Sequence, residues 1–170
     1  PVFLIEDSAG AMLAAIIIHL ESNQGLCDTL TRKLSFRFDK LVLNHPAGYT
    51  DDMGSVYPLF GLRKNITRWF STLLYGEDYP EDEIYLRVSR FDSLLLNAHF
   101  PRTMIVTSTG DKALYPMALR QKEDLDRFHI ENELLVEEKK PNGHVFNVLD
   151  IESETAKRTN EKISDFLKSH

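Results

Sequence analysis

Ser8 stands at a junction where a serine hydroxyl can act as a nucleophile. It follows the apolar run Val2 to Ile5, precedes a long apolar stretch, and is followed by two small residues, Ala9 and Gly10. A serine on a tight turn between a buried strand and a buried helix exposes its hydroxyl, and small neighbours let the helix pack closely behind it. The backbone N–H of Ala9 would lie at the positive end of that helix, where it can stabilise an oxyanion. The pattern therefore predicts nucleophilic chemistry at Ser8.

Alternating strands and helices are expected to position this serine. The runs Val2 to Ile5, Leu41 to Leu43 and Thr103 to Thr107 are continuously apolar or β-branched, a pattern typical of strands buried on both faces of a parallel sheet. A fourth strand is expected over Glu131 to Glu137. Such an alternation predicts an α/β fold with a mostly parallel sheet and flanking helices. The helices are expected over Ala9 to Ser22, Ile66 to Leu74 and Pro116 to Phe128, and in a closing helix with Ala156, Ile163, Phe166 and Leu167 on its apolar side.

Three segments, in order along the chain, carry a resemblance to a known family. Glu6-Asp7-Ser8-Ala9-Gly10 resembles the Gly-Asp-Ser-Ala-Gly nucleophile elbow of the hormone-sensitive-lipase-like carboxylesterases and lipases, within the α/β-hydrolase superfamily. Thr103 to Pro116 is similar to that family's acidic strand-end segment, and Gly143-His144-Val145-Phe146 to its Gly-His-x-Phe loop. The elbow alone is a weak motif, but the ordered set is much more specific, and it spans essentially the whole chain.

The resemblance implies a serine esterase with a catalytic triad of Ser8, Asp111 and His144. In this fold the chain order is Ser, then Asp, then His, and each member follows a strand. His144 would take the proton of Ser8 as the hydroxyl attacks an ester carbonyl, and Asp111 would orient the imidazole. The implied substrate is a small carboxylic ester, the intermediate is an acyl-enzyme, and the oxyanion donor on this side is the Ala9 N–H. No cofactor is expected.

Two departures from the family pattern bear on the site. Glu6 stands where the first glycine of the elbow belongs, which places a side chain at the crowded approach to the turn. Around Asp111, the family writes an aspartate followed by a pair such as Pro-Leu, whereas here Asp111-Lys112-Ala113-Leu114 permits two alignments. One makes Asp111 the triad acid, and the other puts Ala113 there. We favour Asp111, because no other carboxylate lies at this strand end.

Several other polar and aromatic residues have simpler interpretations. Asp7 is interpreted as a structural hydrogen-bonding residue. His45 lies in the loop after the second strand and is interpreted as a structural loop histidine, with substrate contact as the alternative. The sequon Asn65-Ile66-Thr67 is of a kind common by chance. No metal site is predicted, because His19, His99, His129 and His170 lack ligand spacing. The aromatic residues Phe60, Trp69, Phe70 and Tyr75 lie where a cap or acyl pocket would stand, with core packing as the simpler interpretation.

Composition limits the classes of partner. The chain has 170 residues, 42% hydrophobic and 27% charged, with a formal net charge of −6, which is typical of a globular domain. Because no Lys/Arg-rich stripe is present, nucleic acid is not an expected partner. Ala11 to Leu20 is too short for a transmembrane segment. Cys27 is the only cysteine, so no intrachain disulfide can form, and we expect a cytoplasmic location.

The family's first strands and its His-Gly-Gly oxyanion loop have no counterpart here. We therefore expect residues 1–170 to form a single partial domain, the C-terminal half of an α/β-hydrolase fold, inactive without its N-terminal half. The expected partners are an ester substrate and that half, either from the same gene product or as a complementary chain. A non-catalytic fragment serving as a structural or interaction module is the alternative. A peptidase or thioesterase of the same fold is a third possibility, because a triad does not encode the leaving group.

Overall fold

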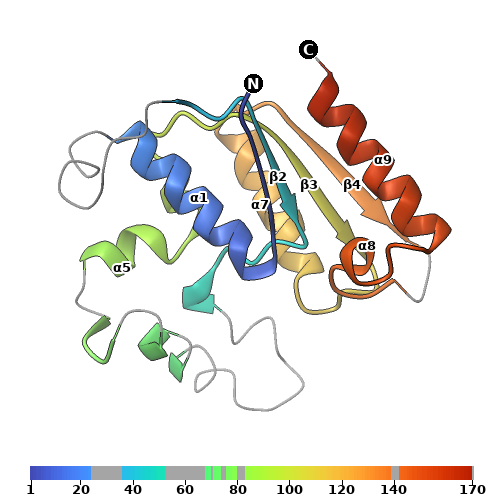
Figure 1. Cartoon of the computed structure of the whole chain (residues 1–170). Coiled ribbons are helices and arrows are strands. Elements are labelled where there is room, and N and C mark those ends of the chain that lie inside the picture. Colours follow the sequence, from blue (N-terminus) through green and yellow to red (C-terminus); the bar gives the residue numbers. More distant parts are fainter. Residues whose placement is uncertain are drawn as a thin grey trace.

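A four-stranded parallel sheet forms the centre of the molecule, which is a computed structural model describing residues 1–23, 36–52, 68–69, 71–73, 76–79, 83–138 and 142–169. The strand order is β1-β2-β3-β4, and every neighbouring pair is parallel. The C-terminal ends of all four strands therefore lie along one side of the sheet (Figure 1). The strands are β1 (Phe3–Asp7), β2 (Lys40–Asn44), β3 (Arg102–Ser108) and β4 (Asn132–Glu137).

Both faces of the central strands are buried, which explains why their sequences do not alternate between polar and apolar residues. On one face Leu41, Leu43 and Ile105 join the larger core. On the opposite face Val42, Met104 and Val106 join a second cluster. Side chains alternate across a strand, so a strand covered on both sides needs apolar residues at every position.

Helices cover each face of the sheet. Apolar side chains of α1 (Ser8–Ser22), α6 (Phe91–Leu95) and α7 (Tyr115–Arg127) fill the larger core. The other face is covered by α9 (Glu154–Lys168), whose Ile163 and Phe166 pack in the second cluster (Figure 1). The remaining elements are the 3-10 helix η1 (Thr50–Asp52), α5 (Glu83–Val88) and α8 (Phe146–Leu149).

The predicted fold class is confirmed, and the predicted strands and long helices agree with the structure to within two residues. The predicted helix over Ile66 to Leu74 lies partly outside the described residues. Three short helices, α5, α6 and α8, were not predicted, because four to six residues are too few to show helical periodicity. Among the helices described, none combines the length and apolar character needed to cross a bilayer.

Strand β1 is an edge of the described sheet, since it pairs only with β2. Two of its apolar side chains, Phe3 and Ile5, are 37% and 51% exposed. On the helix that follows, Leu13 and Ile17 are exposed as well. An apolar edge strand with unpaired backbone groups is a template for pairing with another chain.

Candidate active site

Ser8 lies at the sharp turn from β1 into α1. It is the first residue of the helix and has a φ of +50°, in the left-handed region that a non-glycine residue adopts only under constraint. Asp7 before it is extended, and the Ala47 N–H donates to the Ser8 carbonyl at 3.0 Å. The strained turn is thus tied to the loop that follows β2. This is the geometry that the strand–serine–helix pattern predicted.

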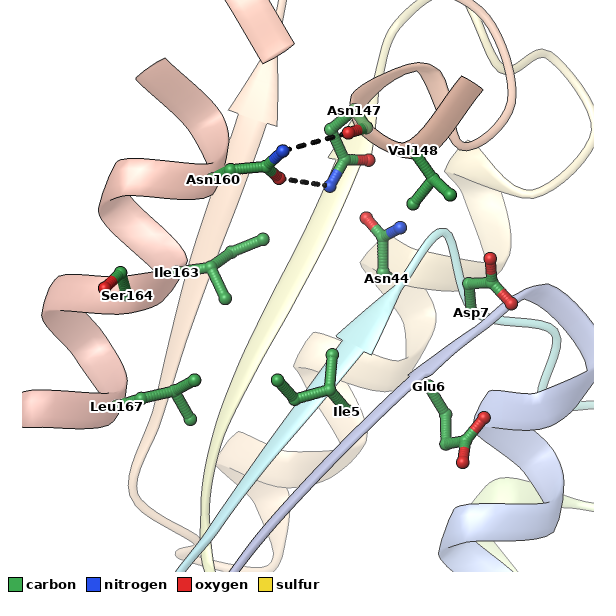
Figure 2. A pocket seen from close by; sticks show the side chains of 10 residues that line it. All are labelled: Ile5, Glu6, Asp7, Asn44, Asn147, Val148, Asn160, Ile163, Ser164 and Leu167. Carbon is green, nitrogen blue, oxygen red and sulfur yellow. Dashed lines mark hydrogen bonds between the residues drawn. The ribbon is translucent and has the colours of Figure 1, made fainter. Parts of the chain in front are cut away.

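The structure shows how Glu6 is accommodated in the elbow. A Cβ added at Gly10 would lie 2.7 Å from Glu6 Oε2, so the carboxylate occupies the space that this glycine leaves open. Figure 2 shows the Glu6 side chain turned toward the start of α1. A negative charge in that position interacts favourably with the positive end of the helix. The contact is made by the end of a flexible side chain, which could move aside, so Glu6 fills this space without making glycine at position 10 indispensable.

His144 meets Ser8 from a loop held against the end of β3. Its Nε2 lies 3.0 Å from Ser8 Oγ, and its side chain is 40% exposed. The loop is fixed by Ser108, whose hydroxyl donates to the Asn142 carbonyl at 2.9 Å. A Cβ at Gly110 would lie 1.9 Å from that same carbonyl oxygen, so only glycine permits this approach. The Ser-Thr-Gly sequence before Asp111 thus serves to seat the histidine loop.

Asp111 is the carboxylate behind His144. Its Oδ2 lies 2.7 Å from His144 Nδ1, and its Oδ1 accepts the Leu114 N–H at 3.1 Å. The side chain is 3% exposed. Of the two alignments that the sequence left open, the one with Asp111 is supported by this contact.

His45 is a fourth residue in this cluster. Its Nδ1 lies 2.8 Å from Asp111 Oδ2, the same oxygen that faces His144, and its side chain is fully buried. The interpretation of His45 as a structural loop histidine missed this contact. The available signal was its position directly after β2, since parallel strands end at the same side of the sheet.

The protonation of Asp111 follows from these contacts. Burial raises the pKa of the Asp111 carboxyl, but hydrogen bonds from His45, the Leu114 N–H and His144 outweigh it and lower the pKa to about 2. The group is therefore a carboxylate near neutral pH, and a carboxylate can only accept hydrogen bonds. Nδ1 of His144 must then carry a proton, which leaves Nε2 of neutral His144 to accept the Ser8 hydroxyl proton.

The N-terminal turn of α1 supplies backbone donors beside Ser8. No side chain caps this helix, and its first turn contains no acidic residue. Amides in the first turn of a helix lack partners within the helix, so the Ala9 N–H can meet an oxygen of a bound molecule. Ala9 is itself exposed.

A hollow of about 500 Å³ lies between the ends of β1 and β2 on one side and the helices α8 and α9 on the other (Figure 2). Ser8, Asp111 and His144 do not line this hollow. Asp7 faces this hollow, and its carboxylate forms no hydrogen bond with the described residues, so its predicted structural role has no partner there. The lining residues are Ile5, Glu6, Asp7, Asn44, Asn147, Val148, Asn160, Ile163, Ser164 and Leu167.

The other residues considered from the sequence lie apart from Ser8, Asp111 and His144 or outside the described residues. His19 is buried, with its Nδ1 2.8 Å from the Leu94 carbonyl, and His99 and His129 are exposed. Trp69 is 61% exposed, which argues against core packing for this member of the aromatic set. Among the described residues, His45, Asp111 and His144 are the one group close enough to hold a metal ion, and they are already joined by hydrogen bonds. Cys27, Phe60, Phe70, Tyr75, His170 and the sequon lie outside the described residues.

Solved structures share this fold. An inhibited esterase B from Lactobacillus rhamnosis superposes with a TM-score of 0.83 at 18% identity, over 97% of this chain and 52% of that one. Carboxyl esterase 2 from Tuber melanosporum gives 0.65 at 22% identity, over 95% and 51%. An acylaminoacyl peptidase bound to a chloromethyl ketone gives 0.66 at 14%, over 98% and 23%.

No protein-family model and no curated protein matches the sequence. The structural likeness shows the fold: a mostly parallel sheet with flanking helices, of the α/β-hydrolase kind. The chain spans about half the length of the esterases that it matches.

The lowered pKa of Asp111 predicts an acid-labile contribution to stability. The folded value of about 2 lies below the ordinary 3.8, so the contribution is fully present above about pH 4 and is lost as the pH falls toward 2 and below. The shift corresponds to about 2 kcal/mol of unfolding free energy. Urea unfolding between pH 5 and 2 should therefore show a steeper loss for the wild type than for Asp111→Asn. If the unfolding free energies of the two proteins fall in parallel with pH, Asp111 does not make this contribution.

Proposed function

We propose that this chain carries the nucleophile, base and acid of a serine esterase that hydrolyses small carboxylic esters. One observation carries the proposal: Ser8 Oγ, His144 and Asp111 form a continuous relay, with 3.0 Å from Oγ to Nε2 and 2.7 Å from Nδ1 to Oδ2. A hydroxyl, an imidazole and a buried carboxylate in this order are the parts needed to activate a serine.

The proposed reaction proceeds in two halves. Ser8 Oγ attacks the ester carbonyl carbon while His144 Nε2 takes the hydroxyl proton, and the resulting imidazolium returns that proton to the departing alcohol. The acyl group is then bonded to Ser8. Water attacks this acyl-enzyme with His144 again as base, which releases the carboxylic acid and restores the serine. The Asp111 carboxylate stabilises the imidazolium in both halves.

The oxyanion that forms in each half of the reaction needs hydrogen-bond donors on the Ala9 side of Ser8. The Ala9 N–H is proposed as one donor, supported by the uncapped start of α1. A second donor would come from a glycine-rich loop outside residues 1–170. Loss of one such donor typically costs about 10²- to 10³-fold in turnover, so this chain alone should be a poor catalyst.

An ester is preferred as substrate on the strength of the structural neighbours. The esterase B structure contains an inhibitor, and the fungal neighbour is a carboxyl esterase. The acylaminoacyl peptidase has the same fold, with a TM-score of 0.66 against 0.83 for the esterase B and 0.65 for the carboxyl esterase. A peptidase would use the same triad on an amide, so comparing matched ester and amide substrates separates the two.

We also propose that residues 1–170 are one partial domain, completed by an N-terminal half or a complementary chain that packs along β1. The exposed Phe3 and Ile5 support an occupant of this edge, as does the hollow beside it. Because this chain spans about half the length of each esterase neighbour, an occupant of about the same size as this chain is supported. The opposing hypothesis of a non-catalytic fragment is disfavoured by the intact relay at Ser8.

Labelling with a fluorophosphonate tests the nucleophile. The probe should form one adduct, at Ser8, in the chain combined with its completing half, and Ser8→Ala should abolish it. His144→Ala should lower turnover of a short-chain p-nitrophenyl ester by on the order of 10⁴-fold or more, because the base is lost. An adduct that persists in Ser8→Ala would refute the assignment.

The two aspartates near Ser8 provide a matched comparison. Asp111→Asn should lower turnover about 10³- to 10⁴-fold, because the amide cannot hold His144 in the productive tautomer. Asp7→Asn should lower it less, since Asp7 faces the hollow and not His144. Steady-state kinetics on both variants shows which aspartate acts as the triad acid. Equal losses of turnover would count against Asp111 in that role.

Replacing Glu6 by glycine should preserve or raise activity. The change restores the residue typical of the elbow, and the Glu6 carboxylate lies against Gly10 and not against Ser8. The initial rate of p-nitrophenyl ester hydrolysis measures the effect, with a thermal melt to report folding. A large loss of activity in a folded variant would instead assign the carboxylate a specific role.

Adding the missing half should restore activity to the isolated chain. Residues 1–170 expressed alone should self-associate and hydrolyse esters at least about 100-fold more slowly than the combined species, since an oxyanion donor is absent. Ile5→Lys should impair this restoration by placing a charge in the hollow, whereas Leu96→Lys, at a residue with the similar exposure of 53%, should not. Sedimentation velocity and ester hydrolysis are the measurements. A fully active monomer of this chain alone would refute the split-domain proposal.

A further inference from the structure

His45 is the buried histidine that the proposed mechanism does not use. It follows β2 with a φ of +50°, and its backbone N–H donates to the Val106 carbonyl at 2.7 Å. Its ring packs edge-on against Phe146 and His144, with centroid distances of 5.7 and 5.5 Å. The strained backbone and the complete burial fix the ring beside Asp111.

The hydrogen bond between His45 and Asp111 has a definite direction. Nδ1 and Oδ2 are 2.8 Å apart, and Asp111 is ionised near neutral pH, so the carboxylate accepts and the imidazole donates. Nδ1 therefore carries a proton. In the neutral ring Nε2 then carries no proton, which agrees with the finding that this buried atom has no hydrogen-bond partner among the described residues.

We propose that His45 is a positioning residue for the acyl-transfer reaction, donating Nδ1–H to the same Asp111 oxygen that accepts from His144. This inference rests on the proposed esterase function. The second donor holds the carboxylate in the rotamer that faces His144. It also shares the negative charge of Oδ2, and so limits how strongly Asp111 holds the His144 imidazolium.

Loss of the His45 donor would change the charge that Asp111 presents to His144. Among the described residues, the titratable groups in contact with Asp111 are His45 at the end of β2 and His144 before α8, and the remaining donor is the Leu114 N–H. Without the His45 proton, the full charge of Oδ2 acts on His144. Its imidazolium then persists to higher pH, so the acidic limb of kcat/KM should move upward.

Two substitutions distinguish the effect of the His45 hydrogen bond from the effect of the volume that the His45 ring occupies. His45→Asn keeps a side-chain N–H close to the position of Nδ1 and tolerates positive φ, whereas His45→Phe keeps a ring against Phe146 and removes the donor. His129→Phe is the matched control for backbone strain, because His129 is exposed and has a φ of +57° away from the site.

The kinetic test uses, without the probe, the same preparation whose Ser8 reacts with the fluorophosphonate. His45→Phe should lower kcat on the order of tenfold with little change in KM, and should move the acidic limb of kcat/KM to higher pH. His45→Asn should have a kcat within a few-fold of the wild-type value and the wild-type acidic limb of kcat/KM. His129→Phe should match the wild type in both. If His45→Phe keeps both the wild-type kcat and the wild-type limb, the inference is wrong.

A second measurement does not depend on turnover. Nitrogen-15 spectra of histidine-labelled protein should show His45 protonated at Nδ1, and protonation at Nε2 alone would overturn the inference. Failure to label wild-type Ser8 would refute the proposed esterase function. Labelled wild type with an unaffected His45→Phe would refute only the role of His45.

Discussion

A buried carboxylate must be surrounded by donors, and the arrangement around Ser8 depends on how this chain meets that need at Asp111. Three donors converge on the Asp111 side chain: the Leu114 N–H on Oδ1, and the imidazoles of His45 and His144 on Oδ2. An unpaired buried charge would cost several kcal/mol, so these partners are structural requirements as well as chemical ones. Since two imidazoles share one oxygen, each limits how closely the other can be held.

The parallel sheet is what brings these donors together. Ser8, His45 and Asp111 follow β1, β2 and β3, whose C-terminal ends are adjacent. The fourth member, His144, arrives on the loop after β4, which can approach the end of β3 only because Gly110 has no side chain. A substitution at Gly110 would thus displace a histidine more than thirty residues further along the chain. The relay depends on a backbone contact at which neither residue does chemistry.

Much of the fold could be predicted from the sequence because the central strands β2 and β3 are buried on both faces. Continuous apolar runs located β1, β2 and β3 within a residue or two, and helical periodicity located α1, α7 and α9. The short helices α5, α6 and α8 were not predicted, since four to six residues are too few to show a helical period. The elements alone do not specify which loops touch. The contact between Asp111 and His144 was anticipated only through a family resemblance.

His45 marks the limit of inference from residue order. From the sequence it is a histidine in a loop before a proline, with nothing nearby for it to bind. Its partner lies 66 residues further along the chain, and the two meet because β2 and β3 are neighbours in the sheet. All four members of the cluster belong to this chain, and their hydrogen bonds need no group from outside it. These hydrogen bonds can therefore be formed within residues 1–170, whereas the Ala9 N–H proposed as an oxyanion donor lies at the start of α1, directly after the edge strand β1.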